Sequence, residues 1–201
     1  MFSARTYMFA AFAITLFWLM SAIHSAPLAC EDLVRPLDQV NAQHLEGRWV
    51  LLAGSLSDPT QMKFFKRRNS SSIYFSMANA TSSISYTPSV LFEGKCHYQT
   101  FNVTLEGSIL TFDARHQVNL TVVFLYTTCQ DCLVMRYDNE SKKTVRLFLF
   151  SRRREAEQEE MEEFRAQVEC LNLLPPAVMD PNEELSPKTN FSNNVTQFNS
   201  M

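Results

Sequence analysis

Short runs of β-branched and aromatic residues, separated by turn residues, fill the chain between residues 48 and 151. Each run has the length and composition of a strand, and no helical pattern intervenes. Eight regularly spaced strands predict an all-β fold, an eight-stranded up-and-down antiparallel barrel. A barrel of this size is just wide enough to hold a small ligand. The runs are Arg48–Ser55, Ser72–Ala78, Ser83–Phe92, Cys96–Leu105, Ser108–Phe112, Asn119–Tyr126, Cys132–Tyr137 and Thr144–Ser151.

An aromatic residue and a basic residue mark the two ends of this strand region. Gly47 and Trp49 stand at the start of the first run, and Arg152 follows the last. Once the barrel closes, the guanidinium can stack on the indole, a contact worth roughly 0.5–2 kcal/mol. We expect this pair to form the barrel floor, which leaves the opposite end as the ligand mouth.

The N-terminal segment has the layout of a secretory signal peptide. Arg5 precedes an apolar run, Met8–Met20, and small residues follow. The run is short for a membrane anchor, which needs about 20 residues. We therefore predict a signal peptide over residues 1–25. The mature chain keeps 17 of 18 basic residues and all 21 acidic ones, and this mildly acidic balance argues against nucleic acid as a partner.

The region after the strands changes period. Apolar residues recur at three- and four-residue steps in Glu155–Leu171, which predicts an amphipathic helix packed on the side of the barrel. Pro175-Pro176 ends this order, and a polar segment rich in Asn and Pro follows. The predicted domain therefore covers residues 26–174, and residues 175–201 are expected to form a flexible glycosylated tail.

The cysteine count and the glycosylation sequons both favour a secreted glycoprotein. The five cysteines are Cys30, Cys96, Cys129, Cys132 and Cys170, and in an oxidising compartment they are expected to be bridged rather than metal-bound. Cys129 and Cys132 predict a bridged or capped hairpin; a redox or zinc site lacks its usual context. An odd count leaves one thiol over. The Asn-X-Ser/Thr sequons begin at Asn69, Asn79, Asn102, Asn119, Asn139, Asn190 and Asn194.

Alternation along the strands predicts which residues face the barrel interior. If Asn119 carries a glycan it faces outward, and charged Arg136 and Asp138 also face outward, which fixes the phase of two strands. In the last strand, two phases remain open: Arg146 shares a face with Phe148 and Phe150, and Val145 shares the other with Leu147 and Leu149. Such a lining fits a filled core as well as a ligand pocket. The predicted inner residues are Ile73, Phe75, Met77, Leu120, Val122, Phe124, Tyr126, Leu133, Met135 and Tyr137.

A basic and aromatic run lies in the long connection after the first strand. We expect Lys63, Lys66, Arg67 and Arg68 to form a mouth loop that steers acidic or amphipathic ligands. A simple solvated loop is the alternative, and a processing site is a weaker one. The histidines outside the signal peptide are scattered, and four glycines cannot build a phosphate loop. The sequence therefore predicts no enzyme, no cofactor and no metal.

Several segments together resemble the lipocalin family. They are Pro27–Cys30, Leu45–Trp49, Ile73–Phe75, Glu163-Phe164 and Cys170-Leu171, with Arg152 after the eighth strand. Within that family the chain is similar to the orosomucoids (alpha-1-acid glycoproteins). It is also similar to their fish relatives, the saxitoxin- and tetrodotoxin-binding and the tributyltin-binding proteins.

The resemblance implies both a disulfide and a pocket. Cys30 would pair with Cys170, but the orosomucoid partner of Cys96 is missing here, so Cys96 is free or pairs with Cys129 or Cys132. The resemblance places Ile73, Phe75, Met135, Phe148 and Phe150 in the pocket, which selects the phase of the last strand.

The function implied is that of a secreted, monomeric plasma carrier of small hydrophobic or amphipathic ligands, toxins or xenobiotics among them, without stable membrane insertion. The alternative is an acute-phase or immunomodulatory glycoprotein that acts through its surface and glycans. A lipocalin-type enzyme would need a cysteine early in the barrel, which this chain lacks.

Overall fold

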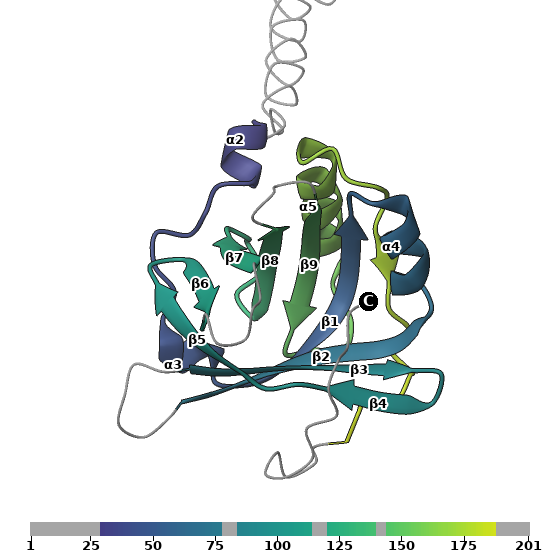
Figure 1. Ribbon diagram of the computed structural model, residues 1–201. Helices are drawn as coiled ribbons and strands as arrows, with labels where there is room; N and C mark the ends of the chain where they lie inside the picture. The colour runs from purple at the N-terminus through teal and green to yellow at the C-terminus, as the bar shows by residue number, and fades with distance from the viewer. Residues whose placement is uncertain (1–28, 78–83, 114–119, 140–143, 188–201) are drawn as a thin grey trace, which may run out of the picture. The chain divides into compact units, whose positions relative to one another are not determined.

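The computed structural model describes residues 29–77, 84–113, 120–139 and 144–187 (Figure 1). The chain divides into two compact units, residues 1–32 and 33–201. In the first unit only residues 29–32 are described, and they include the start of α2 (Cys30–Leu33). The predicted signal peptide and the sequons at Asn79, Asn119, Asn190 and Asn194 lie outside the described residues.

The second unit is an antiparallel barrel, as predicted. Eight strands follow one another around it in the order β1, β2, β3, β5, β6, β7, β8 and β9, and β9 pairs with β1 to close the ring. They are β1 (Gly47–Leu56), β2 (Arg68–Met77), β3 (Ile84–Phe92), β5 (Phe101–Glu106), β6 (Ile109–Phe112), β7 (Leu120–Leu125), β8 (Cys132–Asn139) and β9 (Val145–Ser151). The predicted strand Cys96–Leu105 is divided: β4 (Lys95–Tyr98) pairs with the last part of β3, and β5 with the first part.

The barrel wall separates two apolar clusters. The inner cluster fills the barrel and includes Trp49, Phe75, Phe124 and Phe148. The outer cluster lies between the wall and helix α5 (Gln158–Cys170), which buries Met161, Phe164 and Val168 as the periodicity predicts. Glu157 and Glu160 form a capping box at the start of this helix, which satisfies backbone N–H groups that the helix itself leaves unpaired.

The expected mouth loop is in part a helix. Asp58 caps α4 (Pro59–Phe65) by accepting a hydrogen bond from the Gln61 N–H at 2.7 Å, and Pro59 occupies the first turn. These are strong helix-start signals, and the helix differs from the loop predicted for this connection. Helix α4 buries Met62 and Phe65 in the inner cluster, so it closes the barrel at the end opposite Trp49.

Gly54 makes room for this closure. A Cβ atom at this position would lie 2.4 Å from Phe65 Cζ and 2.6 Å from Phe148 Cδ1, and those two rings stack at 5.4 Å. We therefore expect Gly54→Ala to lower the free energy of unfolding by about 1–3 kcal/mol through overpacking. Urea unfolding measures this. Adding Phe65→Leu should recover part of the loss, and a double variant as unstable as Gly54→Ala alone would contradict the steric argument.

The predicted floor contact is confirmed. The Arg152 guanidinium lies 3.7 Å from the centroid of the Trp49 ring. It also donates hydrogen bonds to the carbonyl oxygens of His44, Glu46 and Arg48 at 2.6–2.8 Å. Gly47 has φ +101°, and a Cβ there would lie 3.0 Å from Arg152 Nη1. The short helix α3 (Ala42–Leu45) completes this end, because the Leu45 carbonyl accepts the Trp49 indole N–H at 2.8 Å.

The prediction of a flexible tail from residue 175 is wrong for residues 175–187. Strand β10 (Ala177–Val178) pairs with Ala53 and Gly54 of β1. Further along, the Glu184 carbonyl accepts from Ser70 Oγ at 2.6 Å, and the Ser186 carbonyl accepts from Arg48 Nη2 at 3.3 Å. Hydrogen bonds to β1 and β2 hold this segment, together with a few apolar side chains, Ala177 and Met179 on the inner cluster and Leu185 on the outer one. Its mostly polar composition gave no indication of this.

The described cysteines are bonded largely as expected. Cys129 and Cys132 form a disulfide, which confirms the bridged hairpin. Cys30 and Cys170 are each disulfide-bonded, the state that their predicted pairing requires. Cys96 is the free thiol, which resolves the alternatives left open for it.

Candidate ligand-binding site

The residues predicted to line the barrel face its interior, with one exception. Tyr126 lies beyond the end of β7 and stacks under the Arg35 guanidinium at 4.0 Å. Phe148 and Phe150 belong to the inner cluster and Leu147 and Leu149 to the outer one, so the last strand has the phase that the resemblance selected. The inner residues are Ile73, Phe75, Met77, Leu120, Val122, Phe124, Leu133, Met135, Tyr137, Phe148 and Phe150.

Aromatic rings pack against one another across the middle of the barrel. Tyr86 lies 5.3 Å from Phe75 and 5.7 Å from Phe112, and Tyr137 lies 5.2 Å from Phe148. Phe148 continues the contact to Phe65 of α4. Such tilted and edge-to-face pairs are the favoured arrangements of aromatic rings. We call these rings the aromatic belt; they fill the middle of the interior. The sequence pattern alone could not distinguish such a filled core from an open pocket.

Two tyrosine hydroxyls meet inside the belt. Tyr86 Oη and Tyr137 Oη lie 3.0 Å apart, one on β3 and the other on β8. Burial raises the pKa of Tyr86 to about 12, and burial together with the neighbouring Tyr86 raises the pKa of Tyr137. Both phenols are therefore neutral at physiological pH. One hydroxyl donates to the other, and the Tyr137 hydroxyl also lies 3.7 Å from Met135 Sδ, a weak acceptor, so the polar pair has partners inside an apolar layer.

The raised pKa of Tyr86 predicts a loss of stability at high pH. Between pH 10 and about 12 an exposed tyrosine in the unfolded chain releases its proton while Tyr86 in the folded protein keeps it. The unfolded state then binds fewer protons, so the free energy of unfolding falls as the pH rises. Urea unfolding across this range should show a shallower fall for Tyr86→Phe than for the original protein. Equal slopes in the two proteins would contradict the prediction.

Two arginines reach the interior near α4. Arg146 begins the inward face of β9 and pairs in register with Tyr137, and Arg68 begins β2 and lies 5.0 Å over the Phe65 ring. Burial, and then the charge of Arg146, lowers the pKa of Arg68 to about 10; burial also lowers the pKa of Arg146. Neither guanidinium forms an ion pair or a hydrogen bond with any residue that the structure describes. We call Arg68 and Arg146 the arginine pair.

The sequence predicts one member of this pair. Arg68 is predicted at the mouth together with Lys63, Lys66 and Arg67, but only Arg68 turns inward. Lys63 and Lys66 are exposed, and Arg67 forms an ion pair with Glu93. The alternation that puts Phe148 and Phe150 inside also puts Arg146 there, so the signal for the second arginine was present in the strand pattern.

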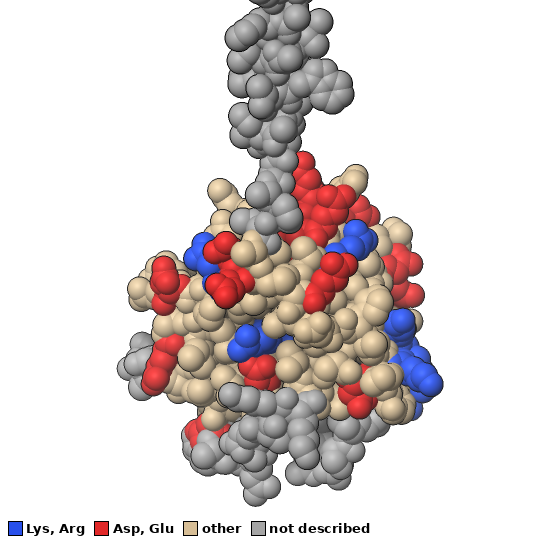
Figure 2. Space-filling view, turned by 90° about the horizontal axis from the view of Figure 1, so that it is seen from above, with Lys and Arg blue, Asp and Glu red and all other residues tan. Residues whose placement is uncertain are grey.

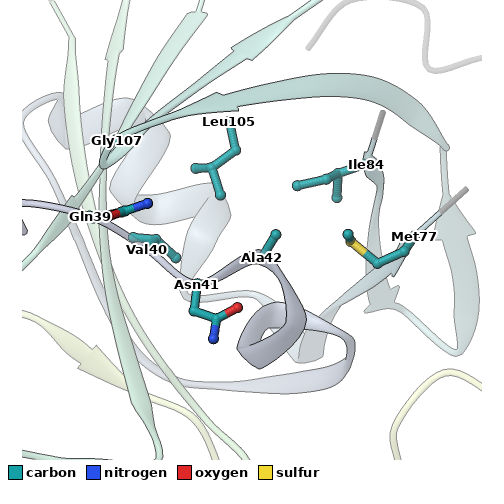
Figure 3. Close-up of a pocket in the computed structure, with 8 residues that line it drawn as sticks. All are labelled: Gln39, Val40, Asn41, Ala42, Met77, Ile84, Leu105 and Gly107. Carbon is teal, nitrogen blue, oxygen red and sulfur yellow. The ribbon is translucent and has the colours of Figure 1, made fainter. Parts of the chain in front are cut away.

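A cavity of about 640 Å³ lies at the floor end of the barrel, beside α3. Figure 3 shows Met77, Ile84 and Leu105 converging on the segment from Gln39 to Ala42. Val40 is tied to the turn between β5 and β6 by a hydrogen bond to the Gly107 carbonyl at 3.0 Å. The sequence predicts a closed floor here. Trp49 and Arg152 do close the part beneath β1, whereas small residues such as Ala42 leave space beneath β2, β3 and β5. We call this space the floor cavity.

One cluster of potential metal ligands lies outside the barrel. Single ligand atoms of Cys129, Asp131, Cys132 and Glu160 lie within 4.8 Å of one another. The two sulfurs are joined as a disulfide, and Arg153 donates hydrogen bonds to both carboxylates. The Arg153 guanidinium holds the pKa of Asp131 below its usual range. A cation already occupies the centre of this cluster, so its donors fit a structural ion-pair network better than a metal site.

Comparison with known proteins identifies the family. The sequence model of the ApoM domain matches residues 27–184. This chain belongs to the ApoM domain family. No curated protein sequence matches it in a direct search.

Solved structures show that this ApoM domain has the lipocalin fold. It is similar to the siderocalin Ex-FABP, described as acting through dual ligand specificities (TM-score 0.58, 16% identity, covering 68% of this chain and 93% of that one). Lipocalin 12 from rat epididymis gives a TM-score of 0.62 at 14% identity, and the match covers 76% of this chain and 91% of that one. Siderocalin Q83, described with a dual ligand binding mode, gives a TM-score of 0.60 at 14% identity, and the match covers 72% of this chain and 94% of that one.

The family and the fold together support the binding of small hydrophobic ligands by this ApoM domain. The interior provides apolar and aromatic walls, the arginine pair near α4, and the floor cavity at the other end. None of the helices among the described residues is long and apolar enough to cross a membrane.

Proposed function

We propose that this ApoM domain carries a small amphipathic molecule whose acidic group, a carboxylate or a phosphate, binds to the arginine pair. The observation that supports this proposal is the pair itself, Arg68 and Arg146, with no acidic partner among the described residues. A desolvated charge without a partner is costly, and an anionic ligand supplies the missing counter-charge. Its apolar part contacts Phe65, Phe148 and the aromatic belt.

The arginine pair also bears on the ligand classes that the resemblance suggested. Two guanidinium groups repel a cationic ligand, so the interior disfavours a guanidinium toxin. They attract the acidic head of a fatty acid or a phospholipid-derived amphiphile, to which a planar guanidinium can donate two parallel hydrogen bonds. We therefore propose an anionic amphiphile, rather than a guanidinium toxin, as the ligand.

The test is a titration with a fatty acid that carries an environment-sensitive fluorophore, compared with its uncharged methyl ester. The acid should bind saturably and about tenfold or more tightly than the ester, because a hydrogen bond to a charged group contributes about 1.5–3 kcal/mol. Equal affinity for the two would contradict the role of the arginine pair. Saturable binding of neither would favour the acute-phase or immunomodulatory alternative, in which the surface and glycans act.

We also propose that the protein is a secreted plasma glycoprotein and a monomer. The Cys129–Cys132 disulfide suits an oxidising compartment. Two sequon asparagines, Asn102 and Asn139, are exposed at the ends or edges of their strands, and Asn69 is half-buried at the start of β2. We therefore expect glycans at Asn102 and Asn139 first, which mass spectrometry of the protein secreted by animal cells would detect.

The floor cavity supports a second candidate, a site for an uncharged apolar ligand. Its volume of about 640 Å³ suits a small molecule, and most of its lining residues are apolar. Leu105→Trp should fill part of it and weaken binding of the methyl ester by about tenfold, the equivalent of roughly 1.4 kcal/mol. The control is Ile109→Trp, at an exposed position just beyond the same turn. Unchanged ester affinity in Leu105→Trp would exclude the floor cavity as its site.

A further inference from the structure

The outward face of α4 is apolar and basic, unlike most of the surface. Phe64 is 52% exposed and is one of three large hydrophobic side chains exposed among the described residues. Lys63 and Lys66 flank it and are also exposed. Arg67 follows, with its guanidinium 5.2 Å from the Phe92 ring and paired with Glu93. Figure 2 shows Lys and Arg side chains gathered at the right-hand edge, the side on which α4 lies in Figure 1.

The helix that carries this face contacts one member of the arginine pair, Arg68, on its opposite side. The opposite side of the same helix buries Met62 and Phe65 in the barrel, and Phe65 lies between the Phe148 ring and the Arg68 guanidinium. A surface that contacts Phe64 would therefore touch the element that closes the barrel at this end. The whole chain is mildly acidic, with 21 acidic and 18 basic residues, so an anionic surface would attract this basic face and repel acidic parts of the remainder.

We propose that the exposed face of α4, formed by Lys63, Phe64 and Lys66, docks the barrel mouth onto an anionic phospholipid surface. Charge complementarity and the Phe64 ring, the one exposed phenyl ring among the described residues, select this partner. The two lysines bind lipid phosphates while the ring enters the interfacial layer, as amphipathic helices do at membrane surfaces. A seven-residue helix is too small to bury a standard protein interface, whereas a fluid lipid surface adapts to it. This docking is peripheral and requires no spanning segment.

The inference rests on the proposed function only for its purpose, which is to load and unload an anionic amphiphile at the lipid surface. Docking itself is measured without any ligand. The protein secreted by animal cells is mixed with vesicles of phosphatidylcholine alone, or of equal parts phosphatidylcholine and phosphatidylserine, and the bound fraction is determined by sedimentation. We expect binding to the anionic vesicles only, with a steep decrease as salt is added.

Variants of α4 and matched controls make the test specific. Lys63→Gln and Lys66→Gln should each lower the partition coefficient about fivefold, the effect of one basic residue near an anionic surface. Phe64→Ala should lower it about tenfold, since a large apolar side chain no longer leaves water. The controls are Arg165→Gln, which removes an exposed charge from α5, and Ile109→Ala, which removes an exposed aliphatic side chain near the floor. Each control should change binding by less than about twofold.

Three outcomes would overturn the proposal. They are no binding to anionic vesicles, equal binding to both kinds of vesicle, and losses in the controls as large as those in the α4 variants. In the first case, binding to a soluble acidic polymer would show that the partner is an acidic molecule other than lipid. The fatty-acid titration measures ligand binding separately. Loss of vesicle binding would therefore leave the carrier function intact, and loss of fatty-acid binding would leave the docking proposal intact.

Discussion

Replacing Trp49 by alanine is expected to lower the free energy of unfolding by about 3–5 kcal/mol, the usual cost of removing a large aromatic side chain from a packed core. Trp49 is fully buried, its indole N–H donates to the Leu45 carbonyl, and the Arg152 guanidinium covers one face of the ring. The substitution therefore opens a cavity at the floor and frees α3 from β1. It also removes the surface on which Arg152 stacks.

Circular dichroism in urea is the appropriate measurement, because it does not depend on tryptophan fluorescence. Trp49 is the only tryptophan after residue 25, so removal of the predicted signal peptide would leave the variant without one. Trp49→Phe is the milder control, since it keeps an aromatic ring and loses the N–H donor. A double-mutant cycle with Arg152→Met should give a coupling of about 0.5–1 kcal/mol for the cation–π contact. A Trp49→Ala variant as stable as the original protein would contradict the floor as described.

The barrel could be predicted because each of its determinants is local in the sequence. Period-two alternation and turn residues fixed the strands, and the three- and four-residue spacing of Met161, Phe164 and Val168 fixed the helix on the outer wall. The contact between Trp49 and Arg152 followed from strand order alone, because closing an up-and-down barrel brings its first and last strands together.

The parts of the structure that differ from the prediction depend on tertiary contacts or, in one case, on a helix start that the sequence does signal. The segment from residue 175 to 187 is ordered by pairing with β1, which no local pattern specifies. Helix α4 replaces part of the predicted loop, although the capping residue Asp58 and Pro59 in the first turn are both helix-start signals. The extent to which the interior is filled depends on how Tyr86, Phe112 and Phe148 pack across the barrel, which alternation cannot give.

Replacing both members of the arginine pair by methionine is expected to lower the affinity for the fluorescent fatty acid about 100-fold or more. Each single variant, Arg68→Met or Arg146→Met, should lower it about tenfold or more, because hydrogen bonds to charged groups contribute about 1.5–3 kcal/mol each. Affinity for the methyl ester should change little, since methionine keeps an apolar stem of similar length. The matched control is Arg67→Met, because Arg67 neighbours Arg68 but is exposed and paired with Glu93.

The stability of the ligand-free variants separates a binding role from a structural one. Burial lowers the pKa of Arg68 in the folded protein, which means that folding disfavours its charged form at neutral pH. Arg68→Met should therefore be at least as stable to urea as the original protein while binding the acid less well. Arg68 would then lower the stability of the ligand-free protein and raise its affinity for the acid. Such a compromise between stability and function is common at binding sites. If Arg68→Met instead unfolds more easily and binds the acid unchanged, the arginine pair is structural and the ligand lies elsewhere.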